Sequence, residues 1–306
     1  MFDRGIKNGK FVDALKKWEH WEKIISDEEL FVAIRKEYIN IYFQGCSLFK
    51  VSYKEGLVLE THYKYLISPE MKNPYVSWVG NSPPVKDLAN QILIDTFDIG
   101  SIEKSACPYA KPEKVGLHKI LRCNRNVIDL EIALSPESDD EADIAEKSAE
   151  GTPAAARVDF AAIQRRQDGK PCIVFFEAKR FDNGELRSET PNPAVIEQTE
   201  RYREFIEKDL PDIKTSYGIV CKNLVDLGLK RIDPLVVEVA GNPGQLEVVP
   251  DVRLVVFDFD QDQKEGRVWK KHKAKLHDYF KDRLLLKGSP DEFTSGISNY
   301  SPKVAA

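Results

Sequence analysis

The stretch from Arg157 to Phe181 constrains the fold of this chain more than any other. Two apolar segments, RVDFAAIQR and PCIVFFEAKRF, flank a turn that contains Asp168 and Gly169. An Asp-Gly pair between two alternating apolar segments is typical of a β-hairpin. We predict a three-residue loop with Gly169 in the left-handed conformation, which pairs Arg166 with Lys170.

This pairing decides which side chains share a face of the hairpin. One face becomes uniformly apolar: it carries Val158, Phe160 and Ala162 opposite Ala178, Phe176 and Val174. On the other face Asp159 lies opposite Glu177, and Arg157 lies opposite Lys179. A two-residue loop would shift the register by one residue and place Asp159 on the apolar face. The hydrophobic pattern therefore favours the three-residue loop.

The polar face predicts a cation site at the end of the second strand. Asp159, Glu177 and Lys179 occupy neighbouring positions there, and the Cβ atoms of paired residues lie about 5 Å apart. Two close carboxylates repel each other unless a cation or a proton lies between them, and Mg²⁺ or Mn²⁺ prefers such oxygen ligands. A lysine beside the ion can position a water or stabilise a charged transition state. The alternative is a solvated strand face with a simple cross-strand ion pair.

A helix expected over 193–208 adds Gln198 and Tyr202, which lie four residues apart and so share a helix face. The ordered set Asp159, Glu177-x-Lys179 and Gln198-x-x-x-Tyr202 resembles the PD-(D/E)xK nuclease superfamily, in its RecB-like and lambda-exonuclease-like branch. The resemblance implies a metal site formed by Asp159, Glu177 and the carbonyl of Ala178. It also implies that Lys179 is the catalytic lysine, and that Gln198 and Tyr202 orient the site or the scissile phosphate.

The resemblance also implies the fold: a mixed α/β protein with a restriction-endonuclease-like core, in which helices flank a central mixed sheet. The elements expected in order are a helix over 85–97, strands over 126–135, 157–166 and 171–181, the helix over 193–208 and a strand over 215–223. The family often adds another acid. Glu131 or Asp129 on the first strand is a candidate, as are Asp87 and Asp95 on the leading helix, but either strand acid is equally explained as a solvated residue.

Outside this core we predict a helix-and-hairpin region over 1–80, with helices over 9–25 and 28–38 and a hairpin over 39–67. The nuclease-like domain then spans 84–286. It includes a flexible acidic insertion over 136–155, because residues 137–150 contain seven acids and one lysine. Strands are expected over 234–260, a basic helix over 266–285 and a loose tail over 287–306.

The chain has a formal net charge of −5, so its overall charge would not attract nucleic acid. Any contact with nucleic acid must come from local clusters of basic residues. The candidates are Arg180 and Arg201 near the predicted site and Lys270, Lys271 and Lys273 on the basic helix, which is equally an ordinary surface helix. Scattered cysteines and the lack of a long apolar segment predict a cytoplasmic chain without a membrane span. No phosphate-binding loop is present.

The sequence therefore predicts a Mg²⁺- or Mn²⁺-dependent nuclease that hydrolyses phosphodiester bonds, with DNA favoured over RNA through the resemblance alone. The competing hypothesis is a catalytically inactive module of the same fold that binds nucleic acid or a protein. In either case the region over 1–80 is a candidate surface for a protein partner or a second copy of the chain.

Overall fold

The computed structural model describes residues 2–68, 89, 92–134, 157–187, 192–290 and 297. Its centre is a five-stranded mixed sheet, as predicted, in the strand order β5-β6-β7-β8-β9. Strands β5, β6 and β7 are antiparallel neighbours, whereas β8 runs parallel to β7 and β9 runs parallel to β8. The strands are β5 (Val127–Ala133), β6 (Arg157–Arg165), β7 (Pro171–Arg180), β8 (Glu247–Phe257) and β9 (Leu284–Leu286).

The hairpin formed by β6 and β7 has the predicted register. Phe160 pairs with Phe176, and the pairing continues without a shift to Arg165 and Pro171. Gly169 has a φ of 84°, the left-handed conformation that the three-residue loop requires. The rings of Phe160 and Phe176 stack with centroids 4.6 Å apart on the apolar face. Turn chemistry and alternation therefore predicted this part of the hairpin. The ladder begins at Phe160 and Phe176, so the predicted pairs Asp159–Glu177 and Arg157–Lys179 are not part of it, and the uniform apolar face is wrong at Val158, which joins the cluster on the opposite face.

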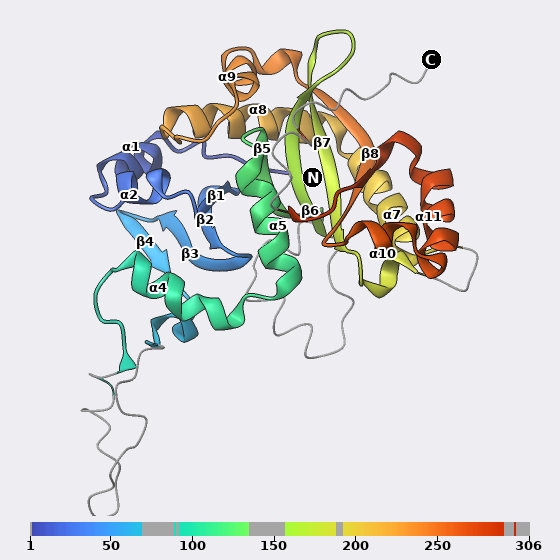
Figure 1. The fold of residues 1–306 in the computed structure, drawn as a ribbon. Helices are drawn as coiled ribbons and strands as arrows, with labels where there is room; N and C mark the ends of the chain where they lie inside the picture. The colour runs from blue at the N-terminus through green and yellow to red at the C-terminus, as the bar shows by residue number, and fades with distance from the viewer. Residues whose placement is uncertain are drawn as a thin grey trace, which may run out of the picture.

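Helices cover both faces of the sheet (Figure 1). Helix α5 (Pro112–Cys123) begins at a proline, which suits a first turn, and packs Leu117 and Ile120 onto the face that carries Phe176. Helices α7 (Ala194–Lys208) and α8 (Leu210–Asp226) cover the opposite face, where Tyr217 of α8 contacts Phe175. Helix α11 (Arg267–Phe280) packs Trp269, Leu276 and Phe280 against α7 and β8, and so the basic helix forms near the predicted bounds.

The N-terminal region is larger than the predicted helix and hairpin. It contains α1 (Gly9–Lys17), α2 (Trp21–Ser26) and an antiparallel sheet in the order β1-β2-β3-β4. Its strands are β1 (Phe31–Ile34), β2 (Tyr38–Phe43), β3 (Cys46–Tyr53) and β4 (Leu57–Glu60). The helix predicted over 28–38 is wrong, because β1 lies there. Val32, Ala33 and Ile34 are all buried, and a short strand buried on both faces has no alternation to identify it.

Two predicted strands are helices. Residues 215–223 lie in α8, where Ile213, Tyr217, Val220 and Leu224 are buried at helical spacing. Residues 234–241 form α9 (Pro234–Gly241), which begins after the capping side chain of Asp233. The strand that pairs in parallel with β7, after the connection through α7, α8 and α9, is therefore β8.

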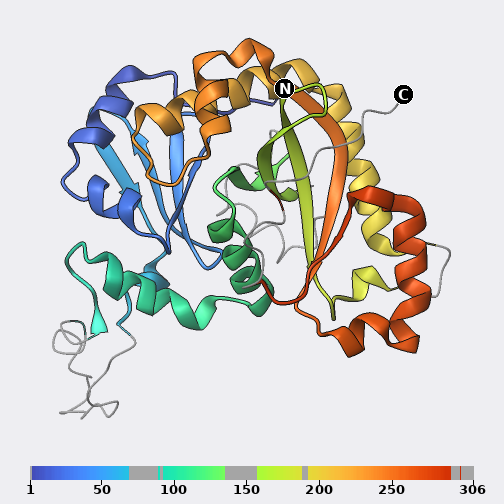
Figure 2. The same ribbon diagram turned by 45° about the horizontal axis from the view of Figure 1, so that its top comes forward.

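Helix α8 runs along one side of the molecule next to both sheets, and α5 lies between the two sheets (Figure 2).

The domain boundary near 80–84, the acidic insertion over 136–155 and residues 85–88, 90 and 91 of the predicted helix over 85–97 lie outside the described residues. Residues 93–97 of that helix are described and are not helical, because Leu93 forms an isolated bridge with Ile67, so this part of the prediction is wrong. Helix α4 (Ile99–Ala106) and α5 occupy a stretch for which we predicted no element, and a short helix α10 (Gln261–Glu265) precedes α11. The loose tail is wrong at Ile297, which is buried and accepts a hydrogen bond from Gln164. None of the described helices is both long and apolar enough to span a membrane.

Candidate functional site

The candidate site lies where β7 ends beside the start of β6. The backbone N–H of Ala178 donates to the Asp159 carboxylate over 2.8 Å, which fixes that side chain against the Glu177–Lys179 segment. Glu177 and Lys179 share one side of β7, with a distance of 2.8 Å between Oε1 and Nζ. Only 2% of Glu177 and 9% of Lys179 is exposed. The alternative of a solvated strand face is therefore wrong.

Glu177 keeps one unused acceptor in this site. Its second oxygen, Oε2, is buried and has no hydrogen-bond partner among the described residues. Lys179 makes a second ion pair, over 2.6 Å, with Glu185 in the short turn after β7. A buried carboxylate oxygen without a donor is costly, and so this atom marks the position where a cation or a hydrogen-bond donor would be stabilised.

Helix α7 brings Gln198 and Tyr202 to the same site. The Gln198 side-chain amide donates to the Tyr202 hydroxyl over 2.6 Å, which leaves the hydroxyl proton free to donate. Burial and the nearby Glu177 carboxylate raise the pKa of Tyr202, so that the phenol stays protonated at neutral pH. The Gln198 side-chain oxygen is buried, and no partner for it lies in the described part of the chain.

The neighbouring strand β5 contributes Glu131 through an unusual backbone conformation. Glu131 has a φ of 50°, in the left-handed region that non-glycine residues adopt at a cost of about 1–3 kcal/mol. As a result Leu130 and Ile132, two residues apart, join hydrophobic clusters on opposite faces of the sheet. The Glu131 carboxylate forms ion pairs with Lys114 of α5 and, over 3.4 Å, with Arg157 of β6. It is therefore a paired acid, whereas we had considered a solvated residue there.

Lys114 links Glu131 to the carboxylates of the hairpin. Its ammonium group pairs with Glu131 and lies 3.8 Å from an Asp159 oxygen. Burial opposes the charged form of this lysine, but the carboxylates of Glu131 and Asp159 outweigh it and raise the pKa of Lys114. The side chains of Lys114 and Asp159 are 33% and 17% exposed, whereas those of Glu177 and Lys179 are 2% and 11% exposed.

The surroundings of the two hairpin acids, Asp159 and Glu177, raise the pKa of both carboxyl groups. Burial, and then the mutual repulsion of the carboxylates, raises the pKa of Glu177 well above its ordinary value. Burial also raises the pKa of Asp159, although Lys114 acts in the opposite direction. Burial lowers the pKa of Lys179, but Glu177 and Asp159 overcome this effect and raise it. Burial and mutual repulsion therefore both disfavour two charged carboxylates here, which favours the uptake of a cation or a proton.

The donor set fits one hard divalent ion in part. Asp159 and Glu177 offer carboxylate oxygens, of which Oε2 of Glu177 has no partner, and Mg²⁺ is commonly bound through one or two carboxylates together with water. No group of three His, Cys, Asp or Glu side chains that could hold a metal occurs within the described ranges. Glu131 is held by Lys114 and Arg157, so the two hairpin acids are the side chains that remain for such an ion.

Other predicted residues lie elsewhere or already have partners. Arg180 pairs with Asp258 over 2.9 Å and with Asp182 over 3.2 Å. Asp129 is fully buried and binds Arg35 and Arg4, and so it is neither solvated nor free to bind a metal. The other predicted nucleic-acid contacts lie on two helices: Arg201 on α7, and Lys270, Lys271 and Lys273 on α11. All of them are exposed except Lys273, which is half-buried. Asp87 lies outside the described residues, and Asp95 is exposed before α4.

Sequence reasoning missed Lys114 and Glu185. The signal for Lys114 was present, because Pro112 precedes apolar residues at helical spacing, Leu117, Ile120 and Leu121. That pattern predicts a helix, but it does not predict that Lys114 on this helix contacts Glu131 of β5. No pattern identified Glu185, which reaches Lys179 through a single turn of 3-10 helix, Gly184–Leu186.

Comparison with known proteins assigns no family to this chain: no family model, no curated protein and no solved structure matches it. Any function must therefore be argued from the site itself.

Proposed function

We propose that this protein is a metal-dependent nuclease with a restriction-endonuclease-like core, which hydrolyses phosphodiester bonds in nucleic acid. The observation that supports the proposal most strongly is the orphaned Oε2 atom of Glu177 beside Asp159 and Lys179. Support also comes from Gln198 and Tyr202, which approach the same carboxylates from a different element. DNA is the proposed substrate only because of the sequence resemblance.

Asp159 and Glu177 would hold one Mg²⁺ or Mn²⁺, with the Ala178 carbonyl as a further proposed ligand. When bound, such an ion supplies an activated water and offsets charge at the scissile phosphate. The N–H of Ala178 keeps one Asp159 oxygen in place, and the other lies 3.8 Å from the ammonium group of Lys114. Lys179 is held between Glu177 and Glu185, from which its ammonium group can donate to a phosphate oxygen.

Tyr202 would donate its free hydroxyl proton within the site, because Gln198 occupies the oxygen as a donor. The approach of a phosphate backbone would bring negative charge toward Lys114, a half-buried cation 3.8 Å from Asp159. Arg180, Arg201, Lys270, Lys271 and Lys273 remain proposed nucleic-acid contacts. For Arg180 this role requires the release of Asp258 or Asp182.

The proposal is tested by incubating the protein with supercoiled plasmid, linear duplex, single-stranded DNA and RNA in Mg²⁺ or Mn²⁺. Cleavage should disappear in Glu177→Gln and Lys179→Ala, and circular dichroism should show both variants folded. Arg165→Gln is the matched control, because Arg165 is an exposed residue of β6 that pairs with Glu238. Cleavage that survives both site variants would rule this site out.

One observation favours the alternative of a catalytically inactive module. Lys114, Lys179 and Arg157 already pair with the acids of the site, which is how a site without a metal would be neutralised. This alternative predicts nucleic-acid or protein binding that does not require a divalent ion and no cleavage of any substrate. For a protein partner, the exposed Leu59 and Tyr63 at the edge of the N-terminal sheet form a candidate surface.

A further inference from the structure

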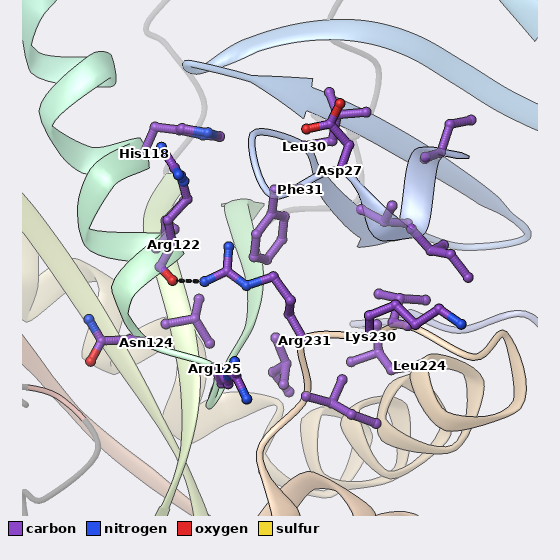
Figure 3. A pocket seen from close by; sticks show the side chains of 18 residues that line it. Asp27, Leu30, Phe31, His118, Arg122, Asn124, Arg125, Leu224, Lys230 and Arg231 are labelled. Atoms are coloured by element: carbon purple, nitrogen blue, oxygen red, sulfur yellow. Dashed lines mark hydrogen bonds between the residues drawn. The ribbon is translucent and has the colours of Figure 1, made fainter. Parts of the chain in front are cut away.

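A pocket lies between the N-terminal region and the five-stranded sheet, and none of its lining residues belongs to the carboxylate site (Figure 3). Its walls come from α2, β1, the second half of α5, the end of α8 and the segment after α8. The cavity has a volume of about 60 Å³. One water needs about 10–15 Å³ by this measure, so the pocket has room for a group of a few heavy atoms.

The lining of this pocket is basic. Arg122, Arg125, Lys230 and Arg231 line it, against the single carboxylate of Asp27. That carboxylate already accepts the backbone N–H of Glu29 over 2.8 Å. Two of the cations are neutralised within the protein, because Arg122 pairs with Glu29 and Lys230 pairs with Glu22.

The other two cations have no acid partner in the described part of the chain. Arg231 donates to the carbonyl oxygens of Glu28 and Arg122, and its buried Nε atom has no partner. Figure 3 shows its guanidinium group reaching across the pocket toward the Arg122 carbonyl. Arg125 is exposed, and its side chain makes no ion pair with any described residue. The pocket thus has a net positive charge that the surrounding protein does not balance.

A buried histidine faces the same space. His118 of α5 is 3% exposed, its ring hydrogen-bonds the Glu29 backbone, and its Nε2 atom has no partner among the described residues. Burial and the charges of Arg122 and Arg231 lower the pKa of His118 to about 4, so the ring is neutral at pH 7. An anion at Nε2 would favour the protonated ring, because an opposite charge stabilises the charged form.

We propose that this pocket binds a small oxyanion, the phosphate or carboxylate group of a small molecule, between Arg231, Arg125 and His118. The cavity admits such a head group, and the two guanidinium groups without an acid partner, of which Arg231 also has an unpartnered Nε–H, supply donors for carboxylate or phosphate oxygens. The inference does not depend on the proposed nuclease function, because none of the three residues belongs to the carboxylate site.

The test is isothermal titration calorimetry of the full chain with inorganic phosphate, phenyl phosphate, acetate and benzoate at constant ionic strength, with chloride as the reference anion. Saturable binding of phosphates alone identifies a phosphate site, and saturable binding of carboxylates alone identifies a carboxylate site. Titration at about pH 5 in two buffers of different ionisation enthalpy should show proton uptake, because a bound anion raises the pKa of His118 from about 4. The other charged groups that line the pocket are Asp27, Arg122, Arg125, Lys230 and Arg231.

Arg125→Gln should weaken binding at least about fivefold, since a hydrogen bond to a charged group is lost. This side chain is exposed and unpaired, so its removal leaves the fold intact. Arg231→Lys should weaken binding as well, while Arg165→Gln and Lys179→Ala should leave it unchanged. The last variant separates this pocket from the proposed catalytic site. The absence of saturable binding for every anion, or binding that Arg125→Gln and Arg231→Lys do not affect, would overturn the proposal.

Discussion

Asp129 is the residue whose replacement should destabilise the fold most, because it joins the two sheets through buried charges. It is fully buried, contacts Arg35, and lies 3.3 Å from Nε of Arg4. It also accepts hydrogen bonds from the Tyr217 hydroxyl over 2.9 Å and from the N–H of Leu130 over 2.8 Å. The N-terminal region, α8 and β5 therefore share one carboxylate.

The cost of breaking this network follows from what remains buried. Removing one partner of a buried ion pair costs about 3–5 kcal/mol, because the other charge stays in the interior. In Arg35→Met, Asp129 keeps Arg4 and Tyr217, so we expect the lower end, about 3 kcal/mol. In Asp129→Leu, two buried guanidinium groups lose this carboxylate together, and we expect about 5 kcal/mol.

Urea unfolding followed by circular dichroism and by tryptophan fluorescence measures these losses. The matched control is Arg165→Met, which breaks an ion pair whose side chains are 49% and 37% exposed. An exposed pair of this kind contributes about 0–1 kcal/mol. If Asp129→Leu costs no more than this control, buried charge does not hold the N-terminal region to the sheet. Two separate urea transitions would contradict the same reasoning, because the shared network predicts that both parts unfold together.

Three further predictions concern the carboxylates. Mn²⁺ at about 100 times its dissociation constant should raise the free energy of unfolding by about 2.7 kcal/mol, and Glu177→Gln should abolish this gain in a thermal-shift titration. Lys114→Met should tighten Mn²⁺ binding, since an ammonium group 3.8 Å from Asp159 repels the ion, and equal affinity in calorimetry would contradict this. Burial and then the charge of Asp27 raise the pKa of the half-buried Glu103 to about 7, so its contribution to stability is present below about pH 4 and lost as the pH rises through 7. After allowance for solvent screening, the free energy of unfolding of the wild-type protein should therefore fall by about 1–2 kcal/mol more than that of Glu103→Gln between about pH 4 and pH 7. If urea unfolding gives the same pH dependence for both proteins, this reasoning is refuted.

The parts of the fold that could be predicted from the sequence are those set by local chemistry. The β6–β7 register follows from one turn and one alternating pattern, and both are contained in 25 consecutive residues, 157–181. The helical spacing of Tyr217, Val220 and Leu224 was equally local. We nevertheless expected a strand over 215–223, because a short apolar stretch does not by itself distinguish a buried strand from part of a buried helix.

The surroundings of the site could not be predicted in this way. Simple alternation places Asp129 and Glu131 on the same face of β5, so the sequence gives no reason to treat them differently. The left-handed conformation of Glu131 alters this alternation, and Asp129 then binds Arg35 while Glu131 binds Lys114. Both arginine and lysine partners come from distant segments, and their positions depend on tertiary packing that no local pattern contains.

The charge balance of the carboxylate site connects its stability to its proposed chemistry. Burial of Asp159 and Glu177 is tolerated in the metal-free chain because Lys114 and Lys179 supply positive charge nearby. Lys179 is held on two sides by Glu177 and Glu185, whereas a third of the Lys114 side chain is exposed. An arriving divalent ion would therefore displace the charge of Lys114 at lower cost than that of Lys179, since the half-buried Lys114 side chain is less buried than that of Lys179 and is not held between the same two carboxylates. A nuclease requires this exchange of cations, whereas a module that only binds would retain Lys114 at Asp159 whether or not Mn²⁺ is present.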